Sequence, residues 1–131
     1  MTLLSWCALI LAGGLGAATR YLVDRVVTRH FGSRWAGALR VGVNLPYGTL
    51  VVNVSGALAL GFVVSAALPG AWAPIVGTGF LGAYTTFSTW MLQTYELAVG
   101  REMGHAAANI VIPAAVGLAA AAGGFWLGTL V

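Results

Sequence analysis

The chain has 131 residues, of which 60% are hydrophobic and only 7% are charged, and its mean hydropathy is +0.92. This composition excludes an ordinary water-soluble domain, in which about a quarter of the residues are charged, and it indicates an integral membrane protein. The formal net charge of +3 reflects six arginines and no lysine, so the placement of those arginines is informative.

Four candidate membrane spans follow one another along the chain. A helix needs about 20 apolar residues to cross the hydrocarbon core of a bilayer, and suitable stretches lie at roughly residues 3–23, 47–68, 72–98 and 105–130. They leave no room for a soluble catalytic domain, so we expect residues 1–131 to form a single all-α membrane domain. The first stretch lacks the basic start and the cleavage site of a signal peptide and is expected to be retained.

The first span carries the sequence GGLGAATRY, with Arg20 near its inner end. A charge at this depth either reaches the membrane surface along its alkyl stem or lies beside a pore. Asp24, one helical turn further on, is close enough in sequence to pair with Arg20. Cys7 is the single cysteine and cannot form an internal disulfide, so we expect it to be a buried small hydrophobic residue.

The arginines favour one orientation in the membrane. Arg25, Arg29, Arg34 and Arg40 are assigned to the first connection and Arg101 to the third, whereas the second connection and both termini contain no basic residue. Because cytoplasmic loops carry the excess of basic residues, we expect the first and third connections in the cytoplasm and both termini outside. This rule and lipid headgroups account for the basic connection without a nucleic-acid partner.

The second span contains Asn53 within GTLVVNVSG. Its expected depth in the hydrocarbon core makes an amide costly unless it has a partner. Two interpretations stay open. Asn53 contacts an ion, or it forms an interhelical hydrogen bond, a common use of membrane asparagine worth on the order of 1 kcal/mol.

The third span is interrupted by GFLGAYTTFSTW at residues 79–90. Irregular backbone survives at membrane depth only where it is buried in protein or lines a polar cavity. The carbonyls and amides freed near Gly82, Thr85 and Thr86 therefore need partners, and ions are the best candidates. Alternatively, the hydroxyl groups of this run bond to the preceding turn and stabilise a kink without any ligand.

Two aromatic residues, Phe87 and Trp90, lie three positions apart and therefore on one helical face. Aromatic residues at this spacing often form a packed core. The edges of their rings, however, carry partial positive charge, so edges turned inward would line a route for a small anion.

The fourth span is rich in small residues. Gly124 and Gly128 lie four positions apart, as do Gly13 and Ala17 in the first span. Small residues at this spacing let helices approach closely, so we expect dense helix packing and oligomerisation.

Three motifs taken together, GGLGAATRY, PYGTLVVNVSG and GTGFLGAYTTFSTW, occur in an order and spacing that resemble the Fluc or CrcB fluoride channels. The resemblance covers almost the whole chain. It implies four transmembrane helices with a break in the third, and an antiparallel dimer that encloses two narrow pores around a structural sodium ion. The implied function is passive export of toxic fluoride across the inner membrane.

The resemblance also assigns pore residues by position. Asn53 matches a pore-lining asparagine and Phe87 matches the first of two pore phenylalanines, whose ring edges are thought to contact the anion. Trp90 stands where the family usually has the second phenylalanine, and its indole N–H is a possible fluoride donor. Ser88 and Thr89 match hydroxyl groups beside the pore phenylalanines.

Two further roles follow from the same resemblance. Gly82 and Thr85 match the sodium ligands, which would offer backbone carbonyl oxygens from both subunits to a hard cation. Arg20 matches an arginine at the cytoplasmic pore entrance, where its charge would raise the local anion concentration.

The fourth span departs from the family, which often places Tyr or Ser at three positions one helical turn apart. Here these positions are Asn109, Pro113 and Gly117. Only Asn109 keeps a side-chain donor, and Pro113 has no N–H and is expected to kink the helix. The sequence therefore predicts that one of the two family-type pores is impaired.

The arginine distribution bears on assembly. An antiparallel homodimer needs one sequence to insert in both orientations, yet five connection arginines fall on one side and none on the other. Besides a homodimer, we therefore consider a pair with an oppositely oriented homologue.

Other function classes fit less well. A four-helix proton-coupled exporter needs a carboxylate in the membrane, and Asp24, Glu96 and Glu102 all lie near span ends. A non-transporting membrane assembly factor would not explain TTFST together with Asn53. We expect no enzyme, because the two histidines lack metal-site partners and no nucleophile has a nearby base.

Overall fold

The structure is a computed structural model that describes the backbone of residues 2–38 and 46–131 and the side chains of residues 2–30 and 46–131. All the regular structure in these residues is helical, which confirms the all-α prediction. The elements are α1 (Leu3–Ala38), α2 (Tyr47–Ser65), the π-helix η1 (Pro74–Leu81), α3 (Gly82–Tyr84), α4 (Ser88–Val99) and α5 (Met103–Gly128).

Three of these helices are long and apolar enough to cross a membrane: the part of α1 from Leu3 to His30, α2 and α5. Residues 72–98, expected as one further span, instead contain η1, α3 and α4 in succession. Residues 85–87 between α3 and α4 are not helical, and Thr85 is extended, with φ −75° and ψ 161°. The chain is therefore an all-helical membrane protein with irregular backbone beside its apolar helices.

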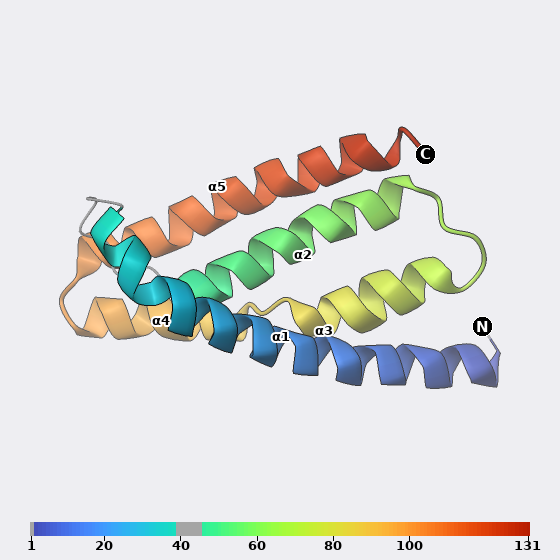
Figure 1. The fold of residues 1–131 in the computed structure, drawn as a ribbon, viewed down its shortest axis with the longest axis horizontal. Helices are drawn as coiled ribbons and strands as arrows, with labels where there is room; N and C mark the ends of the chain where they lie inside the picture. Colours follow the sequence, from blue (N-terminus) through green and yellow to red (C-terminus); the bar gives the residue numbers. More distant parts are fainter. Residues whose placement is uncertain (1, 39–45) are drawn as a thin grey trace.

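The helices form an elongated bundle. Figure 1 shows α2 and α5 side by side and running in the same direction, with α1 and the η1–α3–α4 segment running the opposite way. Both termini lie at one end of the bundle. A core of Val52, Val63, Leu81 and Tyr84 joins α2 to η1 and α3.

Close helix approach depends on glycine, as predicted. A Cβ atom at Gly124 would overlap the carbonyl oxygen of Leu58, and one at Gly128 would overlap the Ser65 hydroxyl. Since Leu58 and Ser65 belong to α2, the two glycines bring α5 against α2 at backbone distance.

The boundaries of the first helix differ from the prediction. α1 continues to Ala38, so Arg25, Arg29 and Arg34 lie on a helix and not in a connection, and Arg40 lies outside the described residues. At about 1.5 Å per residue, a 36-residue helix is about 54 Å long, well beyond the ~30 Å hydrocarbon core. A helix satisfies its own backbone hydrogen bonds, so it continues from lipid into water without penalty.

The environment of Cys7 also differs from the prediction. Cys7 is exposed on the surface of the single chain, not buried. It shares this surface with large apolar side chains such as Leu3, Trp6 and Ile10, as expected for a helix face turned towards lipid or another subunit.

Candidate functional site

The non-helical residues between α3 and α4 are held by the side chain of Asn53 on α2. The Asn53 Nδ2 group donates to the Thr86 carbonyl at 2.9 Å, and the Thr86 N–H donates to Asn53 Oδ1 at 2.8 Å. The amide thus replaces two backbone hydrogen bonds that the interrupted helix cannot form. Of the two interpretations left open for Asn53, a hydrogen bond to a neighbouring segment is observed, and its partner is the non-helical backbone of Thr86. One Nδ2 hydrogen remains for another acceptor.

The hydroxyl groups at residues 85–89 make local hydrogen bonds at the start of α4. Thr86 Oγ1 donates to Thr89 Oγ1 at 3.0 Å and accepts the Thr89 N–H at 3.3 Å, while Ser88 Oγ lies 3.4 Å from Thr86 Oγ1. Thr85 Oγ1 donates back to the Leu81 carbonyl in the preceding turn at 3.0 Å. Of these hydroxyls only that of Thr85 bonds to the preceding turn. Those of Thr86, Ser88 and Thr89 contact one another, and Ser88 and Thr89 stay exposed.

An open groove of about 280 Å³ lies against the interruption. Its lining combines the interruption and α4 with one face each of α2 and α5: Asn53, Ala57, Thr85, Thr86, Phe87, Trp90, Pro113, Ala114, Gly117 and Leu118. Phe87 and Trp90 meet edge to face, with ring centroids 5.8 Å apart and planes at 88°. Phe87 is 69% exposed, so it is not core packing within a single chain.

Asn109 does not line this groove. It is only 1% exposed, and its Nδ2 donates to Thr94 Oγ1 at 2.8 Å between α5 and α4. Its backbone carbonyl accepts the indole N–H of Trp90. The Trp90 donor that the sequence suggested for fluoride is therefore engaged inside the protein. Pro113 and Gly117, the other two positions on α5, do line the groove.

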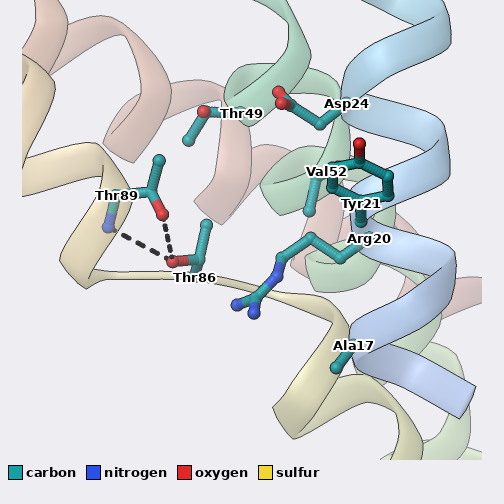
Figure 2. Close-up of a pocket in the computed structure, with 8 residues that line it drawn as sticks. All are labelled: Ala17, Arg20, Tyr21, Asp24, Thr49, Val52, Thr86 and Thr89. Atoms are coloured by element: carbon teal, nitrogen blue, oxygen red, sulfur yellow. Dashed lines mark hydrogen bonds between the residues drawn. The ribbon is translucent and has the colours of Figure 1, made fainter. Parts of the chain in front are cut away.

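Arg20 points towards the interruption. Its Nη1 donates to the Thr85 carbonyl at 3.3 Å, so the guanidinium replaces another missing helical bond. Arg20 also lines a cavity of about 210 Å³ between α1, α2 and the interruption, together with Asp24, Thr49 and Thr89. Figure 2 shows the guanidinium directed away from Asp24.

The suggested Arg20–Asp24 ion pair is not formed. Among the described residues the only contact between a basic and an acidic side chain joins His105 Nδ1 to Glu102 Oε2 at 2.8 Å. The Asp24 carboxylate lies instead against Gly48, where a Cβ atom would overlap it.

Gly82 and Thr85 differ in their surroundings. Gly82 is exposed, which leaves its backbone accessible to a second subunit. The Thr85 carbonyl has two lone pairs, one of which accepts the Arg20 N–H. Both residues offer backbone oxygens, the ligand type that a hard cation prefers, but a positive charge already lies beside one of them.

Sequence reasoning missed Gln93. Its Nε2 donates to Thr49 Oγ1 at 3.0 Å, and within the described part of the chain its buried Oε1 has no hydrogen-bond partner. Helical spacing held the signal, because Gln93 follows Trp90 by three residues and Thr49 precedes Asn53 by four. Both polar groups thus extend the faces that carry Trp90 and Asn53.

Comparison with known proteins identifies the family. Residues 7–125 match the family of CrcB-like proteins, described as Camphor Resistance (CrcB). The chain is 48% identical over 127 residues to the fluoride-specific ion channel FluC 2 of Mycobacterium tuberculosis strain H37Rv, covering 97% of this chain and 93% of that protein. It is 45% identical over 130 residues to FluC 2 of Mycolicibacterium paratuberculosis, covering 99% and 98%.

A more distant relative, the fluoride-specific ion channel FluC 1 of Nocardia farcinica, is 42% identical over 114 residues, which cover 86% of this chain and 73% of that protein. These matches confirm the resemblance drawn from the three motifs. The chain therefore belongs to the CrcB family of fluoride-specific ion channels and is not an enzyme.

Proposed function

We propose that this chain is a subunit of a fluoride channel that passively exports fluoride from the cytoplasm. The observation that carries the proposal is the open groove beside residues 85–87, where the Phe87 and Trp90 rings meet edge to face. Family membership indicates the permeant ion. Passive flow runs down the fluoride gradient, so a cell that accumulates fluoride loses it through such a pore.

Fluoride is small and strongly hydrated, so it needs replacement donors wherever it loses water. Asn53 retains one amide hydrogen beside the groove, and the exposed hydroxyls of Ser88 and Thr89 lie at the start of α4. The positive ring edges of Phe87 and Trp90 supply weaker contacts. These groups form the proposed path, and Asn109 is assigned to holding its wall because it is buried behind Trp90.

Arg20 is the proposed entrance residue. Its charge faces the 210 Å³ cavity that also contains Thr49 and Thr89. A cation in a cavity with low-dielectric walls raises the local concentration of anions.

The proposed assembly is an antiparallel dimer in which η1, α3 and α4 together make a fourth membrane crossing. Phe87 lines the open groove and is exposed in the single chain, so a second subunit is proposed to cover the groove; Gly82 is exposed as well. A homodimer and a pair with an oppositely oriented homologue both satisfy this requirement. The arginine distribution favours the pair, with the first and third connections in the cytoplasm and both termini outside.

A structural sodium ion is proposed at the dimer centre, held by the Gly82 and Thr85 carbonyls of both subunits. It would link the subunits and would not be transported. The guanidinium of Arg20, 3.3 Å from the Thr85 carbonyl, opposes a cation there, so binding requires Arg20 to turn away. Because the sodium ion would link the two subunits, replacing sodium by potassium should weaken the dimer. The subunit dissociation constant in bilayers measures this effect.

The experiment is fluoride efflux from liposomes, with the chain reconstituted alone and then with a co-expressed homologue. A fluoride electrode records the flux, and chloride is the control anion. Flux from the chain alone supports the homodimer, and flux only with the partner supports the pair. Absence of fluoride flux in both preparations, with the protein folded and inserted, contradicts the proposed function.

A further inference from the structure

Pro113 leaves an unpaired carbonyl in α5. In an α-helix the N–H of residue 113 would donate to the carbonyl of residue 109, but proline has no N–H. Pro113 lies well inside α5, which runs from Met103 to Gly128. The Asn109 carbonyl therefore loses its ordinary helical partner in a part of the protein where Asn109 is buried, and such a group is costly unless another donor reaches it.

Trp90 supplies that donor from the neighbouring helix. Its indole N–H donates to the Asn109 carbonyl, which is the same carbonyl that Pro113 leaves free. Two more hydrogen bonds close a ring between the helices. Asn109 Nδ2 donates to Thr94 Oγ1 at 2.8 Å, and Thr94 Oγ1 donates to the Trp90 carbonyl at 2.9 Å.

The ring uses the Thr94 hydroxyl once as donor and once as acceptor, and within the described residues Asn109 Oδ1 has no partner. The single Thr94 hydroxyl hydrogen is used on the Trp90 carbonyl, so Thr94 Oγ1 must accept from Asn109. This fixes the Asn109 side chain, and α5 in turn holds the indole of Trp90 at one end. Because Pro113 and Trp90 both line the groove, the ring of bonds sets the position of an aromatic wall.

We propose that Pro113 is a positioning residue, which frees the Asn109 carbonyl to hold the Trp90 indole in the fluoride path. The expected effect on fluoride flux rests on the proposed function, whereas the hydrogen bond between the Trp90 indole and the Asn109 carbonyl does not. Trp90 and Pro113 are thus coupled, because the indole N–H of Trp90 replaces the helical N–H that Pro113 lacks. Trp90 acts through the edge of its ring, oriented against Phe87, and not by donating its N–H to the anion.

The pairing is tested first without flux. In ¹⁵N–¹H spectra of the full-length protein in micelles, the Trp90 indole resonance is assigned by its loss in W90F. We expect this proton to exchange with solvent at least about tenfold more slowly than that of Trp72, which is 61% exposed. P113A restores a competing helical N–H, so the Trp90 resonance should shift and its exchange should accelerate. Exchange as fast as that of Trp72 in the unaltered protein would overturn the pairing.

The consequence for the groove is tested by a double-mutant cycle on fluoride efflux. P113A should change flux by roughly threefold or more in the presence of Trp90 and have little effect in the W90F background. W126F is the control, because Trp126 lies on α5 as Pro113 does and its side chain is exposed. This substitution should alter neither the Trp90 resonance nor the flux. Additive effects of P113A and W90F would refute the positioning role. Absence of flux in every variant, both alone and with the co-expressed homologue, while the indole stays protected, would reject the proposed function and leave the pairing intact.

Discussion

Removing the Asn53 amide should destabilise the interruption of the helix and stop conduction together. Asn53→Ala deletes both hydrogen bonds to Thr86. The N–H and carbonyl of Thr86 are then unpaired, and Thr86 is only 9% exposed. A buried polar group without a partner costs about 1–3 kcal/mol, whereas hydrogen bonds between membrane helices average about 0.6 kcal/mol. Water from the adjoining cavity can recover part of the loss, so we expect about 2 kcal/mol in all.

Ser55→Ala is the matched control. Ser55 lies on the same helix, and its hydroxyl is 2.9 Å from the Tyr84 hydroxyl, so the substitution removes one interhelical bond away from the groove. We expect a loss of about 1 kcal/mol or less with flux preserved. Equilibrium unfolding in mixed micelles, followed by tryptophan fluorescence, measures both variants.

Fluoride efflux then separates stability from the pore. Asn53→Ala should lower flux by at least about tenfold, because the non-helical residues lose their anchor and the groove loses an amide donor. If Asn53→Ala destabilises the protein no more than Ser55→Ala, the two hydrogen bonds from Asn53 to Thr86 do not stabilise residues 85–87, and the reasoning is refuted. If it destabilises the protein but flux is unchanged, Asn53 is purely structural.

Three further predictions concern the groove and its entrance. Phe87→Ile removes the ring edge at similar volume and should abolish flux, whereas Phe125→Ile on an exposed face of α5 should leave it unchanged; equal flux in both would assign Phe87 to interface packing. Gly117→Ser adds a hydroxyl donor to the groove at a position where a Cβ atom meets no neighbour within 4 Å. The variant should fold normally, and liposome assays should show roughly threefold higher flux. Gly123→Ser is the control, because Gly123 is equally unobstructed but does not line the groove. Arg20→Gln should reduce flux several-fold at low ionic strength and much less at high ionic strength, and a salt-independent reduction would contradict electrostatic attraction.

The sequence predicted the helical class and the location of the interruption because both depend on local chemistry. Long apolar stretches indicate membrane helices, and the hydroxyl cluster at Thr85 and Thr86 indicates backbone that needs partners. Asn53 could be identified as important since a lone amide in an apolar helix is costly. Its bonding partner could not, because the pairing of Asn53 with Thr86 depends on how α2 packs against the interruption.

Other features depend on contacts that the sequence does not encode locally. The extension of α1 was missed because arginines such as Arg25 and Arg29 suggest a loop, although a helix leaving the membrane accommodates them in water. The family resemblance assigned Asn109 to the pore together with Pro113 and Gly117. The structure turns its side chain towards Thr94 instead, because the Asn109 carbonyl and amide both bond to α4.

The two walls of the groove differ in a way that bears on assembly. Polar groups come from Asn53 and the interruption, whereas the α5 wall consists of Pro113, Ala114, Gly117 and Leu118, which offer no side-chain donor. In the proposed channel this chain would solvate an anion in the groove from one side only, so the covering subunit would have to provide the remaining donors. A second copy would present its own interruption or its own apolar α5, while a homologue with hydroxyls on α5 would complete the shell. The one-sided arginines favour the hetero-pair, and the lack of donors on α5 adds to this preference if a second copy would cover the groove with its own α5.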